Sequence, residues 1–146
     1  MQRNCRLLYI CDKRQELFSD ITDLYPHAKF TPDIRDVLSD EQVDSVLIST
    51  PVSNHFHLAR VSLKRGKNVF IEKPFTITVK EAKELNKLAK INNVSLMVGH
   101  LLLFHPAFIK IKNIVDEGKI GDIQYIYSNR LNLGSFRNDE NVLWSF

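Results

Sequence analysis

A glutamate and a lysine stand side by side where a short apolar segment ends, in the sequence VFIEKP at residues 69–74. The apolar residues are β-branched or aromatic, which is typical of a buried strand, and Pro74 cannot continue strand pairing. Ligands of open α/β sheets bind at the carboxyl ends of the strands. There, the Lys73 ammonium could act through its positive field, or as a base if its pKa were lowered. Glu72 and Lys73 therefore mark a candidate site, although a solvated strand end can have the same sequence.

Alternating apolar segments must position this pair. Strands are predicted over residues 7–11, 28–30, 44–49, 68–72 and 95–98, and helices over 13–24, 55–65, 78–91 and from Pro106 to Gly118, with a short helix behind Asp33. Short connections between such segments are typical of βαβ units with a parallel sheet. The pattern therefore predicts the α/β class, with strands that helices cover on both faces.

Several helix ends carry local signals. Thr78 and Glu81 have the spacing of a capping box, in which both side chains bond main-chain amides at the helix start. Ser53 and Asn54 are candidate N-caps for the helix before Gly66, and Gly66 is typical of a helix end.

An alternating segment follows the last predicted helix. Side chains over residues 123–131 alternate in type, which predicts a further strand. We interpret this strand as the opening of a second, sheet-based domain. The predicted organisation is a first domain at 1–121 and the start of a C-terminal α+β domain at 122–146.

Composition narrows the class of protein. The chain has 146 residues with 44% hydrophobic and 25% charged residues and a net charge of +3, which are ordinary globular values. Basic residues are scattered, so we expect no nucleic-acid partner. Cys5 and Cys11 have no metal-ligand spacing and are read as reduced thiols of a cytoplasmic protein without a bound metal. No apolar run is long enough for a membrane span.

Short motifs follow one another in a fixed order along nearly the whole chain. They are Thr50-Pro51 with His55, Gly66-Lys67, Glu72-Lys73-Pro74, Gly99-His100, Phe104-x-Pro106, Gly118-x-Ile120-Gly121 and Arg130-Leu131-Asn132-Leu133-Gly134. This series resembles the glucose–fructose oxidoreductase/inositol dehydrogenase (Gfo/Idh/MocA) family. The tail around Arg137 and Trp144 is most similar to members that act on nucleotide-activated sugars such as UDP-N-acetyl sugars.

The resemblance implies a dehydrogenase that transfers a hydride between NAD and a sugar hydroxyl. If the residue roles of the family apply to this chain, Lys73 is the catalytic residue and lies beside the carbon that reacts. Asp12 would accept hydrogen bonds from the adenosine ribose, which favours NAD, although Lys13 and Arg14 behind it leave room for NADP. The other implied cofactor-binding residues are Thr50, Pro51, His55, Glu72, Gly99 and His100, and the implied substrate-binding residues are Lys73, Arg130, Asn132 and Arg137.

Two departures from the family pattern qualify this assignment. A dinucleotide fold opens with a strand, a Gly-x-Gly-x-x-Gly turn and a helix, and the five glycines of this chain have no such spacing. We therefore expect an incomplete Rossmann-type, doubly wound parallel sheet, whose missing first strand belongs between the strands ending at Asp12 and Ser49. The family also continues beyond the segment around Trp144. The chain resembles the middle of a longer enzyme and is expected to be inactive and to bind dinucleotide weakly on its own.

Other interpretations stay open. A phosphate-receiver domain also has Lys-Pro after a strand, but Asp12 is the single acid after the first strand, and Ser49 stands where the receiver needs an aspartate. A non-catalytic binding remnant is the other alternative. The apolar edges beside the missing strand predict a homo-oligomer or a complementing chain. The Lys73-Pro74 peptide bond is predicted to be cis, because the chain must turn sharply there.

Overall fold

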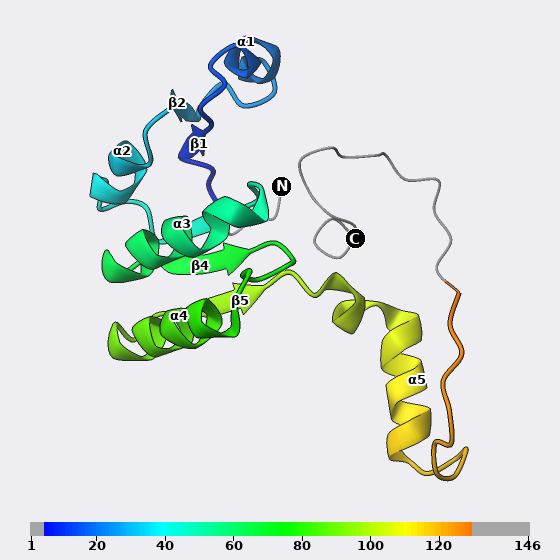
Figure 1. Ribbon diagram of the computed structural model, residues 1–146. Helices are drawn as coiled ribbons and strands as arrows, with labels where there is room; N and C mark the ends of the chain where they lie inside the picture. Colours follow the sequence, from blue (N-terminus) through cyan, green and yellow to red (C-terminus); the bar gives the residue numbers. More distant parts are fainter. Residues whose placement is uncertain (1–4, 130–146) are drawn as a thin grey trace. The chain divides into compact units, whose positions relative to one another are not determined.

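The computed structural model describes residues 5–129, in which short strands alternate with helices (Figure 1). In chain order the elements are β1 Tyr9–Cys11, α1 Leu17–Thr22, β2 Lys29–Thr31, α2 Ile34–Ser39, β3 Ser45–Ile48, α3 Val52–Lys64, β4 Asn68–Ile71, α4 Val79–Ile91, β5 Leu96–Val98, the 3₁₀ helix η1 Leu101–Phe104 and α5 Pro106–Asp116. The chain forms two compact units, one up to Val98 and one from Gly99 onward. The predicted domain boundary at 121/122 stays a prediction.

The strands of the first unit form two parallel sheets. β1 pairs with β2, and β3, β4 and β5 pair in that order. Each parallel pair is connected through a helix, as βαβ units require. The predicted α/β class with parallel strands is therefore confirmed.

No described strand pairs with both sheets. In a parallel pair, alternate residues direct both main-chain groups to the same neighbour. Leu8 accepts from Lys29, and Asp44 accepts from Asn68. The next residue of each edge strand, Tyr9 in β1 and Ser45 in β3, therefore points its main-chain groups away from its partner strand. Within residues 5–129 no strand lies between these edges of β1 and β3. The first Rossmann strand was expected at this place.

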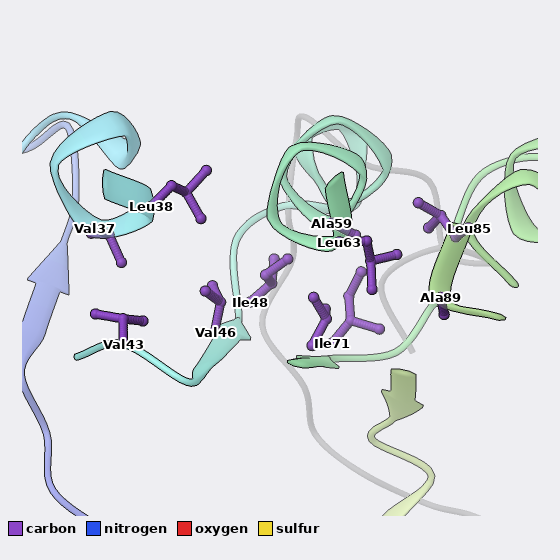
Figure 2. Close-up of a cluster of buried hydrophobic side chains, with 11 residues drawn as sticks. Val37, Leu38, Val43, Val46, Ile48, Ala59, Leu63, Ile71, Leu85 and Ala89 are labelled. Atoms are coloured by element: carbon purple, nitrogen blue, oxygen red, sulfur yellow. The ribbon is translucent and has the colours of Figure 1, made fainter. Parts of the chain in front are cut away.

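A cluster of buried apolar side chains joins α2, α3 and α4 to β3 and β4 (Figure 2). The 13-residue helix α3 packs on β3 and β4 and lies beside α4. Ala59 and Leu63 of α3 and Leu85 of α4 are fully buried over Ile71 of β4. Burial of a Leu or Ile side chain contributes about 1.5–3 kcal/mol, so this contact fixes the strand end that precedes Lys73.

The opposite face of the β3–β5 sheet is uncovered in the first unit. Leu47 pairs in register with Phe70, and Phe70 with Met97, so the three side chains form a row across the sheet. Leu47 is 68% exposed and Met97 44% exposed. Helices were expected to cover both faces of the strands. Within this unit they cover one face of the β3–β5 sheet, and the other face is exposed.

The second unit contains η1 and α5. Pro106 occupies the first turn of α5, as predicted, and the His105 side chain accepts from the Ala107 amide at the helix start. Residues 123–129 form no strand, which corrects the described part of the strand predicted over 123–131. A strand needs a neighbour for its hydrogen bonds, and no described segment pairs with these residues.

Local signals at the helix ends had mixed outcomes. The capping box of Thr78 and Glu81 is formed, with Thr78 Oγ1 accepting from the Glu81 amide at 3.2 Å. Asp33 caps α2 by accepting from the Arg35 amide. The predicted caps Ser53 and Asn54 are wrong, because α3 begins at Val52, after Pro51, and both residues lie inside the helix.

Candidate functional site

Lys73 is the second residue after the end of β4, and it is exposed. The preceding residue, Glu72, anchors the strand end: its amide donates to the Ile48 carbonyl of β3 at 2.9 Å. The carboxylate of Glu72 accepts from the Lys73 amide at 3.3 Å. In the part of the chain that the structure describes, no carboxylate forms an ion pair with the Lys73 ammonium. The ammonium is therefore available to an incoming ligand.

The Lys73-Pro74 peptide bond is cis, as predicted. The carbonyl oxygen of Pro74 contacts a side chain of α3. This contact is 2.8 Å long and is made by Nδ1 of His55.

Thr50 and Pro51 form the connection between β3 and α3. Both are exposed, so they are accessible to a ligand at the carboxyl end of β3. The Pro51 carbonyl accepts from the Asn54 amide at 3.0 Å, and no side chain caps the start of α3.

His55 is buried between these two connections, with 1% of its surface exposed. Its Nε2 lies 2.7 Å from the Thr50 carbonyl oxygen, and its Nδ1 contacts Pro74 as described. Both ring nitrogens are thus occupied by main-chain oxygens. A role in holding the loops fits this environment better than the direct cofactor contact that the resemblance implies.

Asp12 directly follows β1, and its amide donates to the Thr31 carbonyl at 3.2 Å. The carboxylate accepts from the Arg14 guanidinium on both oxygens and from the Arg14 amide. The hydrogen bond from the Arg14 side chain lowers the pKa of Asp12 below its ordinary value of 3.8. An ionised carboxylate has further lone pairs, so it fits the ribose hydroxyls of an adenosine even with Arg14 in place.

The remaining predicted residues fall in different parts of the chain. Gly99 and His100 belong to the second unit; Gly99 is buried and His100, which precedes η1, is exposed. Arg130, Asn132 and Arg137 lie outside the described residues.

The structure brings together some of the predicted site residues and leaves the others separate. His55 joins Thr50 to the Lys73-Pro74 turn. These two segments follow the neighbouring strands β3 and β4. Within residues 5–129 no hydrogen bond links Asp12 to them. Sequence reasoning missed the carbonyl of Pro74 as a partner of His55, because a main-chain group carries no residue-type signal.

Comparison with known proteins identifies the family to which the chain belongs. Residues 1–100 match the sequence profile of an oxidoreductase family described as having an NAD-binding Rossmann fold, GFO_IDH_MocA. The chain belongs to this family. The Gfo/Idh/MocA assignment excludes the phosphate-receiver interpretation and confirms the expected Rossmann-type fold.

Two curated Gfo/Idh/MocA-like relatives have named activities. The NAD-dependent scyllo-inositol 2-dehydrogenase of Bacillus subtilis is 36% identical over 93 residues, which is 64% of this chain and 27% of the relative. The NADP-dependent D-xylose 1-dehydrogenase of Hypocrea jecorina is 35% identical over 111 residues, which is 76% of this chain and 28% of the relative. Relatives of both cofactor types therefore match this chain.

A solved structure supports the fold. The apo scyllo-inositol dehydrogenase of Lactobacillus casei superposes with a TM-score of 0.75 and 22% identity, over 82% of this chain and 36% of that chain. The chain spans about a third of the length of the curated relatives it matches.

The described residues fit the two ends of a dinucleotide better than its middle. Asp12 offers the carboxylate expected beside an adenosine ribose, and Lys73 offers an exposed ammonium that forms no ion pair with a carboxylate of the described residues. A pyrophosphate is normally held by a glycine-rich turn at a helix N-terminus. Within residues 5–129 each of the positive-φ glycines, Gly66, Gly118 and Gly121, follows a helix instead.

No helix of residues 5–129 has the length and apolar composition of a membrane span. The same residues contain no cluster of three or more side chains that could hold a metal ion.

Proposed function

We propose that this chain carries part of the catalytic site of an NAD(P)-dependent dehydrogenase that acts on a sugar or sugar-derived hydroxyl. The observation that carries the proposal is the exposed Lys73, which follows the strand β4 that α3 covers on one face and immediately precedes Pro74, whose carbonyl oxygen lies 2.8 Å from Nδ1 of His55. Family membership supplies the reaction class, and the inositol and xylose dehydrogenases among the relatives support a polyol or sugar substrate.

In the proposed reaction a sugar C–H bond breaks with its electron pair, and the hydroxyl on the same carbon loses its proton as the carbonyl forms. NAD(P), when bound, supplies the hydride acceptor. If neutral, the Lys73 amine would take the hydroxyl proton. If charged, the Lys73 ammonium would donate a hydrogen bond to the reacting oxygen and stabilise negative charge on it, and the proton would pass to water. Asp12 would bind the adenosine ribose, and Thr50, Pro51 and Glu72 would line the rest of the dinucleotide. Gly99 and His100, which belong to the second unit, are proposed as cofactor-binding residues on the family resemblance alone.

We propose a nucleotide-activated sugar as the substrate, for which Arg130, Asn132 and Arg137 would provide the contacts. Guanidinium groups bind phosphate oxygens in a bidentate manner, so two arginines after the last described residue suit a diphosphate. The support for this finer assignment is the sequence of the tail. Turnover of free inositols or aldoses in preference to UDP-sugars would contradict it.

We propose further that a parallel strand completes the sheet between β1 and β3. The support is the pair of free edges, where Tyr9 and Cys11 on one side and Ser45 and Leu47 on the other direct their main-chain groups away from the paired strands. Unpaired strand edges accept another strand readily. A glycine-rich turn after such a strand would supply the pyrophosphate cradle, and a second chain or the same polypeptide could provide it.

A cytoplasmic location is proposed from the cysteines. Both Cys5 and Cys11 are free thiols in the structure, which is the usual state in a reducing compartment.

The test of this function is hydride transfer by a sheet-completed protein. A strand–Gly-x-Gly-x-x-Gly–helix segment is fused ahead of the chain, and reduction of NAD and NADP is followed with inositols, aldoses and UDP-sugars. Lys73→Met is expected to lower kcat by about 10²–10⁴-fold, whereas Lys64→Met, at an exposed lysine of α3, leaves it unchanged. Equal activity of Lys73→Met and the unsubstituted protein would contradict the role of Lys73.

A non-catalytic binding protein is the second candidate. The described strands form two separate sheets, and the described residues contain no glycine-rich turn to hold a pyrophosphate. Both features favour a protein that does not turn over NAD(P). Binding of a UDP-sugar by the sheet-completed protein, without NAD(P) reduction for any sugar, would support this alternative.

A further inference from the structure

The buried imidazole of His55 connects two loops that belong to different strands. His55 lies in the first turns of α3, and its ring nitrogens contact the carbonyl oxygens of Thr50, after β3, and Pro74, after β4. The distances are 2.7 Å from Nε2 to Thr50 and 2.8 Å from Nδ1 to Pro74. The ring is 1% exposed, so water does not compete for these bonds.

The chemistry of the two partners fixes the direction of both bonds. A main-chain carbonyl can only accept, so each ring nitrogen must carry a hydrogen to bond it. A neutral imidazole has one N–H and can hold one carbonyl; an imidazolium has two and holds both. A charge-assisted hydrogen bond is roughly twice as strong as a neutral one, and a buried carbonyl without a donor is costly. One side chain thus contributes to the placement of both loops.

The loops so joined carry the residues of the proposed site. Thr50 and Pro51 lie on one loop, and Lys73 immediately precedes Pro74 on the other. β3 and β4 are already paired up to Ile48 and Ile71, with one further bond from the Glu72 amide to Ile48. After these paired residues, His55 is the described side chain that contacts both the loop after β3 and the loop after β4.

We propose that His55 is a positioning residue, which holds Lys73 at a fixed place relative to the Thr50-Pro51 loop without touching the cofactor or the substrate itself. This inference rests on the proposed function for the meaning of that placement, but the coupling between the loops is a property of the chain alone. Displacement of a reacting group by about 1 Å can cost 10²-fold in rate, so a device that fixes Lys73 has a direct catalytic consequence.

The first experiment compares amide spectra of three variants of the full chain. His55→Phe keeps the aromatic volume and removes both donors, His55→Gln restores a donor group, and His57→Phe changes an exposed histidine of the same helix. In His55→Phe the ¹⁵N amide resonances of both loops, those of Ser49 and Thr50 on one and of Glu72, Lys73 and Phe75 on the other, are expected to shift and lose order, with S² falling from about 0.85 to below 0.6. His55→Gln recovers part of the order, and His57→Phe matches the unsubstituted chain. Perturbation of only one loop would overturn the proposal.

A second measurement needs no substitution and covers the case in which His55→Phe does not fold. In the unsubstituted chain, ring ¹⁵N resonances report which nitrogens carry hydrogen, and couplings across the hydrogen bonds identify the acceptors. Where the ring carries both hydrogens, couplings to the carbonyl carbons of both Thr50 and Pro74 are expected. A coupling to one of them alone would overturn the proposal.

Kinetics of the sheet-completed enzyme separate the two claims. If the proposed function holds, His55→Phe lowers kcat about 10–100-fold with little change in the KM for sugar, and His55→Gln recovers part of kcat. If the loops lose order in His55→Phe while the unsubstituted enzyme shows no turnover, the positioning role stands and the proposed function fails. Unchanged kcat in a His55→Phe enzyme that turns over sugar would contradict the positioning role.

Discussion

Arg14 holds the carboxylate of Asp12 from both sides at the end of β1. Its Nη2 donates to Oδ2 at 3.0 Å, and its Nε and its main-chain amide donate to Oδ1 at 3.2 and 2.9 Å. The pair places a negative and a positive group where an adenosine ribose is expected. The carboxylate favours the two hydroxyls of NAD, whereas a released guanidinium would favour the 2′-phosphate of NADP.

Loss of the Asp12 charge is predicted to change the cofactor preference. In Asp12→Asn the Arg14 guanidinium is freed, so the affinity for adenosine 2′,5′-bisphosphate relative to 5′-ADP should rise about tenfold, which corresponds to about 1.4 kcal/mol. Amide NMR titrations measure both affinities, even when binding is weak. Asp33→Asn removes a similar Asp–Arg pair and serves as the matched control. An unchanged ratio in Asp12→Asn would exclude this role for the pair.

Acid should weaken the fold through a small set of carboxylates. Hydrogen bonds lower the pKa of Asp12 and Asp33, mainly from Arg14 and Arg35, and that of Asp40, mainly from the Gln42 amide and then the Tyr9 hydroxyl. A pKa lowered by folding contributes stability that is present above the ordinary value of 3.8 and is lost as the pH falls through the lower, folded value.

The urea midpoint is therefore predicted to fall as the pH is lowered from about 5 to about 3. In Asp40→Asn the fall should be smaller, because Tyr9 and Gln42 lose a partner whose charge depends on pH. Glu41→Gln changes the exposed neighbour and should behave like the unsubstituted chain. A pH dependence of Asp40→Asn equal to that of the unsubstituted chain would show that Asp40 does not contribute.

Lys67 is predicted to be structural, although it belongs to the Gly66-Lys67 motif. Its side chain is 9% exposed, and its ammonium donates to the Asp40 carbonyl, one residue after α2, at 3.0 Å. Lys67→Met should lower the free energy of unfolding by about 1.5–3 kcal/mol, the usual contribution of a charged hydrogen bond. Lys64→Met, at an exposed position of α3, should change it by less than about 0.5 kcal/mol. Equal stability of the two variants would count against the buried bond.

The apolar row of Leu47, Phe70 and Met97 is predicted to cause self-association. The row lies on the uncovered face of the β3–β5 sheet, and exposed apolar patches favour association. The double variant Leu47→Lys/Met97→Lys should remain monomeric over a hundredfold range of concentration in sedimentation velocity, whereas the unsubstituted chain should not. Ile91→Lys alters an exposed residue of α4 and should leave association intact. A monomeric unsubstituted chain would disprove the prediction.

Element types were predictable where local patterns were strong. The capping box at Thr78, the glycine after α3 and the apolar strand before Glu72 each carry a signal in the residue types themselves, and each was found. The start of α3 was misplaced because Ser53 and Asn54 are good caps in general, yet the connection from β3 enters the helix at Pro51. The predicted helix over 13–24 shortened to Leu17–Thr22.

The candidate site was only partly predictable for a related reason. The resemblance pointed to Lys73, and the cis bond was predicted from the sharp turn that the chain must make at Pro74. The environment of His55 depends on main-chain oxygens of two loops that are 19 and 5 residues away in sequence, and no spacing of side-chain types encodes such contacts. Similarly, the split between β1 and β3 was foreseen from a missing motif, whereas the exposed row on the β3–β5 sheet depends on strand register.

The most direct test of the account is a titration of the ¹⁵N-labelled chain with NADH, followed amide by amide. The account predicts weak, saturable binding, with the largest shifts at Asp12, Thr50 and Lys73, which follow three strands. Shifts that are absent at all concentrations, or that cluster instead at Gly66 and Ser95 where strands begin, would contradict the assignment of a dinucleotide site to this chain.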